Sequence, residues 1–428
     1  MVGLIFLALG VTLILGMPIA IGMVVSALTP MMMGSNAGGS VNQMITNSFS
    51  GADSTPIIAV PLFILAGVIM AEGGISRRLF SVFAYFVGKF TGGLPCAVIL
   101  TCLFYGAISG SGPATTAAVG AMAIPFLVEL GYDEVFSAGM VATAGGLGVI
   151  IPPSIPFVLY SMATGVSTGA LFIGGVLPGI FIGFCLMAYA VYYCRKHGED
   201  RQKIDASLRQ MRDMGLFRIL WSSLPALMSP VIVLGGIYSG IVTPTEAACI
   251  SVFYSLIVSV CCYRSMKVKD IIPCLRNAVK TYTPLCFLLA FAVAFGRVLT
   301  LLKAPAIISA FVLGNFSSAN AVIGIIVVIF FLMGMVMDTG PAIVILAPIL
   351  LPIVTALRIH PVHFGVIMTC CLSIGLVTPP FGLDLFVAST LCNKPPMTVA
   401  KSALPFILAF GVALICITYV PWLSLALL

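Results

Sequence analysis

Residues 146–153 read Gly-Leu-Gly-Val-Ile-Ile-Pro-Pro, and residues 373–380 read Ser-Ile-Gly-Leu-Val-Thr-Pro-Pro. Each Pro-Pro pair lies inside an apolar stretch, the first over 134–164 and the second over 360–392. A proline inside a helix removes a backbone donor and clashes with the preceding turn, so the helix kinks or ends there. The two stretches are therefore predicted to be helices that are broken in the middle.

A Gly-Pro motif precedes each of these broken segments. Residues 109–113 read Ser-Gly-Ser-Gly-Pro, and residues 337–341 read Met-Asp-Thr-Gly-Pro. The motifs lie at the centres of two apolar stretches, 92–130 and 316–357, which are too long for one membrane crossing of about 20 residues. Because Gly-Pro breaks a helix, we expect two re-entrant hairpins that enter the membrane and return to the same side.

The four motifs form an internal repeat. The two Gly-Pro motifs are 228 residues apart and the two Pro-Pro motifs are 227 residues apart, in the same order. Interrupted segments in matching positions of two halves are typical of secondary transporters, which bind substrate near the membrane midplane. The chain is predicted to contain two repeats, over 1–218 and 219–428.

The composition excludes a water-soluble protein. Hydrophobic residues make up 61% of the 428 residues, charged residues only 8%, and the mean hydropathy is +1.20. A soluble chain of this length has about a quarter of its residues charged. We therefore expect an all-α polytopic membrane protein. Besides the two hairpins, its predicted spanning segments are 2–28, 56–72, 134–164, 168–194, 222–240, 244–263, 280–302, 360–392 and 398–425, with amphipathic connectors at 76–91 and 303–315.

The basic residues predict the orientation. Of the 20 Lys and Arg, 12 lie in 195–218 and 264–280, beside apolar segments. Cytoplasmic loops of membrane proteins carry such an excess, so both loops are predicted to be cytoplasmic. Counting spans from them places the first hairpin on the cytoplasmic side and the second on the periplasmic side. The repeats are then inverted, the N-terminus is cytoplasmic and the C-terminus is periplasmic.

Broken helices suggest ion and carboxylate binding. Free carbonyls at the end of one half-helix suit a cation, and amides at the start of the next suit a carboxylate. Oxygen ligands of low net charge suit Na⁺ better than zinc. The first predicted ligand set is Ser109, Ser111, Gly112, Gly148, Ile151 and Pro153. The second is Asp338, Thr339, Gly340, Gly375, Thr378 and Pro379. Substrate contacts are predicted at Thr115, Ser154, Tyr160, Gly382 and Asp384.

Structural roles stay open for several of these residues. The glycine and proline motifs could be plain kinks that help helices pack. Asp338 could be a helix N-cap that also binds a cation, and Asp384 could be a structural hydrogen-bonding residue. The sequence contains neither a phosphate-binding GxxxxGK[ST] motif nor an acid, base and nucleophile at one depth, so we expect neither ATP hydrolysis nor another enzymatic activity.

The motifs together resemble a known family, the large membrane subunit of tripartite ATP-independent periplasmic (TRAP) transporters, over essentially the whole chain. The resemblance is carried by residues 109–113, 146–154, 236–247, 334–338 and 373–382. It implies Na⁺-driven uptake of an organic acid across the bacterial or archaeal inner membrane. It also implies two partners, a periplasmic substrate-binding protein and a small four-helix membrane subunit. A transport domain of hairpins and broken helices would slide, as an elevator, against a scaffold of the remaining helices.

Carrying over the family's sodium sites selects the same two predicted ligand sets. One position departs from the family, which commonly has an uncharged polar residue, often Asn, where this chain has Asp384. A carboxylate there would oppose an anionic substrate unless it is protonated or paired. Sialic acid, C4-dicarboxylates and keto-sugar acids all remain as substrates, with a lean toward sialic acid. The alternatives are a stand-alone Na⁺/dicarboxylate symporter and a channel-like structural subunit.

Overall fold

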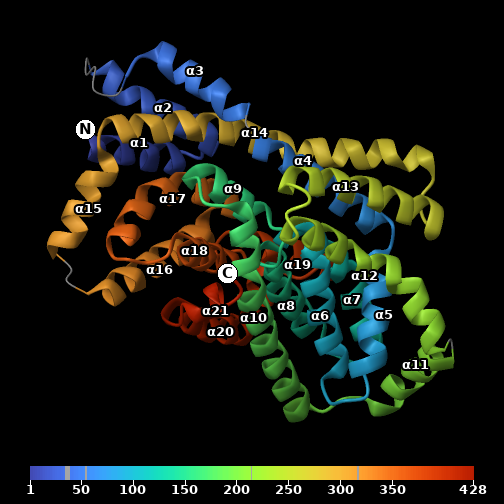
Figure 1. The fold of residues 1–428 in the computed structure, drawn as a ribbon. Coiled ribbons are helices and arrows are strands. Elements are labelled where there is room, and N and C mark those ends of the chain that lie inside the picture. Colours follow the sequence, from blue (N-terminus) through green and yellow to red (C-terminus); the bar gives the residue numbers. More distant parts are fainter. Residues whose placement is uncertain (34–38, 54, 214, 316–317) are drawn as a thin grey trace.

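The computed structural model describes residues 1–428 except 34–38, 54, 214 and 316–317, and the described part of the chain is helical throughout (Figure 1). The helices before the first hairpin are α1 (Val2–Ile14), α2 (Ile19–Met32), α3 (Val41–Ala52), α4 (Thr55–Glu72) and α5 (Ile75–Val87). The first hairpin and broken segment comprise α6 (Gly93–Ser109), α7 (Gly112–Glu129), α8 (Glu134–Gly145), the 3₁₀ turn η2 (Gly146–Val149) and α9 (Ile155–Thr164).

The middle of the chain contains its longest helices. These segments are α10 (Thr168–His197), α11 (Arg201–Asp213), α12 (Leu216–Tyr238), α13 (Pro244–Leu256), the π turn η3 (Ile257–Cys262), η4 (Val268–Asp270), α14 (Ile271–Leu301) and α15 (Ala304–Asn315). The second hairpin, the second broken segment and the C-terminal helices are α16 (Ala319–Val336), α17 (Thr339–Ala356), α18 (Pro361–Gly375), α19 (Leu383–Cys392), α20 (Pro396–Tyr419) and α21 (Trp422–Leu425).

The amino-terminal prediction is wrong in one respect. The stretch 2–28 is not one spanning helix, because it folds into α1 and α2, which pack against each other. Gly16 has a φ of +74° and Pro18 is the N-cap of α2, so the chain turns between them. Helices of 13 and 14 residues reach only about 20 Å. The predicted cytoplasmic position of the N-terminus was counted from a single span and loses that support.

Most other predicted segments are confirmed as helices. Within the described residues, seven helices are long and apolar enough to cross a membrane, or eight if α4 and α5, bent by 69°, form one span. The basic loop 195–218 is largely helical, since α11 occupies most of it. On α20, Leu404, Leu408, Val412 and Ile415 are all more than half exposed. This apolar stripe is typical of a surface that faces lipid, and the chain is a polytopic membrane protein.

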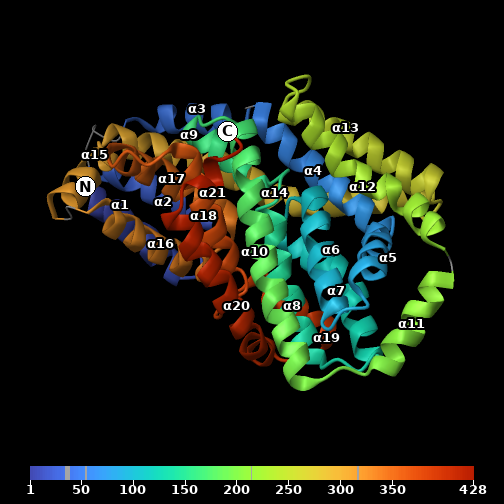
Figure 2. The same ribbon diagram turned by 60° about the horizontal axis from the view of Figure 1, so that its bottom comes forward.

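The two hairpins pack in a crossed arrangement. The first, α6 and α7, contacts α8, and the second, α16 and α17, contacts α18. The later half of each broken segment packs on the other hairpin, since α9 contacts α17 and α19 contacts α7. Figure 2 shows α6, α7, α8 and α19 side by side. The two halves of the chain therefore form one packed body around their breaks.

The long helix α14 crosses the molecule outside this body. It contacts α2 and α3 near its C-terminal half and also contacts α4 and α17. Figure 1 shows it running from the α1–α3 group towards α13. Because α14 contacts α17 and lies beside the hairpins, its side chains can contribute to a site between the tips.

Candidate functional site

The first hairpin tip packs directly on the first break. Helix α6 ends at Ser109, Gly110 has a φ of +63°, and α7 begins at Gly112. A Cβ placed on Gly106 of α6 would lie 2.7 Å from the Cα of Gly148 in η2. Glycine at both positions therefore lets the backbone of the hairpin touch the backbone of the break.

Oxygen atoms of the first tip gather beside Gly148. The hydroxyl oxygens of Ser109 and Thr115 lie 2.8 Å apart, and the Thr115 hydroxyl donates to the carbonyl of Ser111 at 2.8 Å. A Cβ on Gly148 would lie 2.7 Å from that carbonyl oxygen and would overlap the Thr115 hydroxyl. Several predicted ligands of the first set thus surround a space that one methyl group would fill. Uncharged oxygens in this arrangement fit an alkali cation.

Two further residues of the first set lie around the same tip. The amide of Ile155 donates to the carbonyl of Gly110 at 3.2 Å, and a Cβ on Gly110 would lie 2.8 Å from the carbonyl oxygen of Pro153. The side chain of Ile151 points away and packs against Gly179 of α10. Pro153 is therefore next to the tip, whereas the side chain of Ile151 anchors the break to α10.

The second hairpin makes the same backbone contact with the second break. A Cβ on Gly375 would lie 2.5 Å from the Cα of Gly334 in α16. The amide of Phe381 also donates to the carbonyl of Met335 at 3.2 Å, which holds the break against the hairpin. Gly334 and Gly375 follow Gly106 and Gly148 by the same 228 and 227 residues that separate the sequence motifs.

Asp338 is the N-cap of α17 at the second tip. Its Oδ1 accepts a hydrogen bond from the amide of Thr339 at 2.7 Å. This structural role, foreseen as an alternative, is confirmed, and the carboxylate also faces a cavity. The hydroxyl of Thr378 donates to the carbonyl of Ile374 at 2.8 Å, which leaves its lone pairs available as an acceptor. Gly340 lies in the first turn of α17, behind the cap.

A cavity of about 390 Å³ lies between the two tips. Both tips, the start of α9, one residue of α4 and the middle of α14 line it. The lining residues are Ile64, Gly110, Ser111, Pro113, Ala114, Val149, Ile155, Pro156, Leu159, Thr281, Pro284, Leu285, Asp338, Thr339 and Gly340. The structure thus brings Ser111, Asp338 and Gly340, which are 227 or more residues apart in the chain, to one cavity wall.

The predicted substrate contacts Ser154, Tyr160 and Thr115 do not line this cavity. The Ser154 hydroxyl accepts from the amide of Phe157 and donates to a carbonyl of η2, so Ser154 is the N-cap of α9. The buried Tyr160 hydroxyl donates to the carbonyl of Pro361 at 2.8 Å and ties α9 to the start of α18. Substrate contacts at these positions, and at Gly382, which precedes α19, stay predictions.

Asp384 lies where the two halves meet. It is fully buried, and among the described residues neither of its carboxylate oxygens has a hydrogen-bond partner. A Cβ on Gly112 would lie 2.9 Å from one of these oxygens, at the start of α7. Nearby, the hydroxyl of Ser373 donates to the carbonyl of Gly146 at 2.7 Å and joins the two breaks directly. Asp384 is therefore inserted between the halves and does not line the cavity between the tips.

The sequence did not point to α14 as part of the site. Thr281, Pro284 and Leu285 form one wall of the cavity, although 280–302 was predicted only as a spanning segment. A threonine one turn before a proline inside an apolar helix was the available indication. Its position against the hairpin tips depends on packing between distant segments, which no local motif describes.

A second cavity, of about 430 Å³, adjoins the first. It shares Ile64, Ser111, Ala114 and Thr281 with it and continues along α4, α7 and α14 to Glu72 and Asn277. Four alanines of α7, at positions 114, 117, 118 and 121, form one side of this cavity. Since Glu72 ends α4 and Asn277 lies in the first turns of α14, the cavity extends toward the basic segment 264–280.

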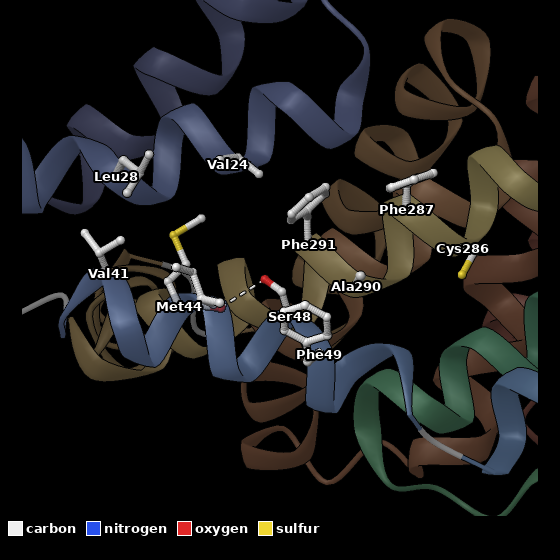
Figure 3. Close-up of a pocket in the computed structure, with 11 residues that line it drawn as sticks. Val24, Leu28, Val41, Met44, Ser48, Phe49, Cys286, Phe287, Ala290 and Phe291 are labelled. Atoms are coloured by element: carbon white, nitrogen blue, oxygen red, sulfur yellow. Dashed lines mark hydrogen bonds between the residues drawn. The ribbon is translucent and has the colours of Figure 1, made fainter.

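A third cavity, of about 410 Å³, has no chemistry for an organic anion. Figure 3 shows it between α2, α3 and α14, lined by side chains such as Leu28, Met44 and Phe291. The hydroxyl of Ser48 already donates to the carbonyl of Met44 at 2.9 Å. Within the described ranges, no three His, Cys, Asp or Glu side chains form a group that could hold a metal ion. The cavity between the tips is therefore the candidate site for a polar substrate.

A family model described as "Tripartite ATP-independent periplasmic transporter, DctM component" matches residues 6–423. The chain is 43% identical over 411 residues to the isethionate TRAP transporter permease protein DctMQ of Oleidesulfovibrio alaskensis. The match covers 96% of this chain and 63% of that protein, so the chain spans less than two thirds of its length. It is 39% identical to the C4-dicarboxylate TRAP transporter large permease protein DctM of Pseudomonas aeruginosa, over 91% of this chain and 90% of that one.

A more distant relative is the sialic acid TRAP transporter large permease protein SiaM of Vibrio cholerae, 30% identical over 100% of this chain and 98% of that one. Two solved structures share the fold. The YdaH transporter of Alcanivorax borkumensis has a TM-score of 0.57 at 16% identity, covering 87% of this chain and 88% of that one. MtrF of Neisseria gonorrhoeae has a TM-score of 0.63 at 12% identity, covering 88% and 83%.

The family match and the relatives agree with the motifs and with the helical membrane fold. The relatives are transporter permease subunits and not enzymes. This chain belongs to the DctM-component family of tripartite ATP-independent periplasmic transporters, as the large, multi-pass membrane subunit.

Proposed function

We propose that this chain moves a small organic anion across the bacterial inner membrane, driven by Na⁺, and that the anion binds between the two hairpin tips. The observation that carries the proposal is the cavity of about 390 Å³ whose wall includes Ser111, Asp338 and Gly340. Na⁺ bound by the oxygens at each tip would neutralise Asp338 and offset the charge of an incoming carboxylate or sulfonate. Each ion would thereby favour substrate binding, which is the basis of coupling.

The two predicted ligand sets become the two proposed Na⁺ sites. The first uses the Ser109 and Ser111 oxygens at the tip beside Gly148. The second uses the tip at Asp338 and the break at Gly375 and Thr378. The matching glycine contacts at the two breaks support the proposed inverted repeats over 1–218 and 219–428. The repeats would place related sites on the two sides of one substrate cavity.

An elevator movement accounts for release. We propose that the hairpins and broken helices form the transport domain, and that α14 and the other outer helices form the scaffold. The adjoining cavity of about 430 Å³ passes between α7 and the scaffold helices α4 and α14 toward the basic segment 264–280. The positive-inside rule makes that face cytoplasmic, so this cavity would be the route by which the anion leaves.

The substrate class and the partners follow from the relatives. The more identical relatives print isethionate and C4-dicarboxylate in their names, and a more distant one prints sialic acid. We propose an anion of two to four carbons, received from a periplasmic binding protein and moved with the help of a small membrane subunit. A stand-alone Na⁺/dicarboxylate symporter is the alternative, and it would work without either partner.

The test is uptake into proteoliposomes that contain the purified permease, its small subunit and its cognate binding protein. Radiolabelled isethionate and a radiolabelled C4-dicarboxylate are the probes, with and without an inward Na⁺ gradient. We expect uptake of at least one probe only with Na⁺ and the binding protein, and strong loss of uptake in Ser111→Ala combined with Thr378→Ala. Uptake that ignores Na⁺, or that survives the double substitution, would rule out the mechanism.

Asp338→Asn separates ion binding from helix capping. Asparagine caps helices about as well as aspartate, so the start of α17 is retained while the negative charge is lost. We expect normal folding but a rise of about tenfold or more in the Na⁺ concentration for half-maximal uptake, since a charged oxygen ligand binds a cation more strongly. An unchanged Na⁺ dependence in Asp338→Asn would remove this carboxylate from the proposed second site.

A further inference from the structure

A basic cavity lies at the bend between α4 and α5. It has a volume of about 510 Å³, and α5, α12 and the segment after η3 line it. Three guanidinium groups and three hydroxyl groups border it, from Arg77, Arg78, Arg218, Ser222, Ser223 and Ser265. None of these residues belongs to the substrate cavity or to a proposed Na⁺ site.

Arg78 builds the wall of this cavity. Its Nη1 donates to the carbonyls of Gly73 and Gly74, at 3.1 Å each, and its guanidinium lies 3.7 Å from the ring centroid of Tyr263. The hydroxyl of Ser265 donates to the carbonyl of Gly73 at 3.0 Å. These contacts fix the bend against the segment after η3, so the cavity is a built feature of the fold.

Arg77 and Arg218 are free to bind a ligand. Both are exposed, and in the part of the chain that the structure describes neither guanidinium has an ion pair or a hydrogen bond. Two unpaired positive groups on one cavity repel each other, and an anion between them would remove this repulsion. The planar guanidinium group matches the oxygens of a phosphate.

The surroundings favour a phospholipid over a free anion. On α12, Phe217 and Trp221 are 78% and 67% exposed and stack with their ring centroids 6.0 Å apart. They flank Arg218 at the start of a predicted membrane span. Exposed tryptophan next to basic residues is typical of the membrane–water interface, where lipid headgroups lie. The cavity therefore lies at headgroup depth, with an aromatic surface beside it for an acyl chain.

We propose that this cavity binds the phosphate group of an anionic phospholipid, held by Arg77 and Arg218. Arg218 and Ser265 come from the two ends of the basic loops 195–218 and 264–280, so the site joins both loops to the bend at Gly73–Gly74. A bound lipid would hold α5, which packs on α6 of the first hairpin, against α12. The proposal does not depend on Na⁺ coupling or on the identity of the transported anion.

The chain provides its own probe for a test. It has two tryptophans, Trp221 and Trp422, so Trp422→Phe leaves Trp221 as the only one. The purified protein in uncharged detergent micelles is titrated with brominated-chain phosphatidylglycerol or with brominated-chain phosphatidylcholine, and quenching of Trp221 fluorescence is recorded. We expect phosphatidylglycerol to quench at a mole fraction about 30-fold lower than phosphatidylcholine, because two arginines contribute to headgroup binding.

The charge-matched comparison is Arg77→Ala with Arg218→Ala against Lys269→Ala with Arg276→Ala. The second pair removes the same charge from exposed residues that do not line the cavity. We expect the first pair to abolish the preference for phosphatidylglycerol, the single substitutions to give intermediate values, and the second pair to keep it. Equal quenching by both lipids in the unsubstituted cavity, loss of the preference in both pairs, or full displacement by inorganic phosphate would overturn the proposal.

Discussion

Alanine at Gly148 or at Gly375 is expected to abolish uptake of the transported anion into reconstituted vesicles. A Cβ on Gly148 would lie 2.7 Å from the Ser111 carbonyl oxygen and overlap the Thr115 hydroxyl. A Cβ on Gly375 would lie 2.5 Å from the Cα of Gly334. The neighbours in both places are mainly backbone atoms, which cannot turn aside as a flexible side chain can. Either substitution must therefore push a hairpin away from its break and disperse the oxygens beside it.

The matched control is alanine at Gly296 of α14 or at Gly411 of α20. Nothing lies within 4 Å of a Cβ at either position, and alanine is favoured over glycine inside a helix by about 1 kcal/mol. Both controls should keep wild-type uptake and wild-type thermal stability. The measurement is the initial uptake rate per amount of inserted protein. Wild-type rates in Gly148→Ala or Gly375→Ala would mean that the backbone contacts between hairpin and break are dispensable.

Glu199→Ala is expected to lower the stability of the protein strongly. The Glu199 side chain is only 2% exposed, and its Oε1 accepts hydrogen bonds from the Gly92 amide at 2.9 Å and from the Tyr132 hydroxyl at 2.6 Å. Its Oε2 forms an ion pair with Arg201 at 2.9 Å. Burial, followed by the hydrogen bond to Glu199, raises the pKa of Tyr132, so this hydroxyl stays protonated and donates. Each buried donor left without a partner costs about 1–3 kcal/mol.

The expected result is a fall of several degrees in the apparent Tm of the detergent-solubilised protein. Tyr132→Phe removes one of the hydrogen bonds and should lower Tm by less. Lys203→Ala is the control, because it breaks only a pair of partly exposed side chains 3.7 Å apart, which contributes at most about 1 kcal/mol. A Tm for Glu199→Ala equal to that of Lys203→Ala would show that Glu199 does not hold the entry to α6, the α7–α8 turn and the start of α11 together.

Much of the fold could be predicted because its breaks are local. Gly-Pro and Pro-Pro interrupt a helix wherever they occur, and both hairpin turns and both breaks lie where these motifs predict them. The turn between α1 and α2 was missed because a length criterion counts apolar residues and overlooks a Gly16–Pro18 turn inside them. The capping role of Asp338 was foreseen because the preference for an acid at a helix start is also local.

The candidate site could be predicted only in part. Ser111, Asp338 and Gly340 were named and line the cavity, whereas Thr281 and Leu285 were not named, since their contribution depends on how α14 crosses the hairpins. The burial of Asp384 between the halves was also beyond reach. Its sequence neighbours place it just after a break, but the Gly112 that it contacts is contributed by the opposite half of the chain.

The crossed packing of α9 on α17 and of α19 on α7 has a consequence for biogenesis. Each half of the chain leaves part of its hairpin uncovered until the other half is synthesised and inserted. The first hairpin must therefore wait in the bilayer, unpartnered, while about 230 further residues are translated. Its final position is then set by a late docking step, in which α19 arrives against α7. Maturation of this membrane protein thus ends with a long-range assembly event rather than with the insertion of its last helix.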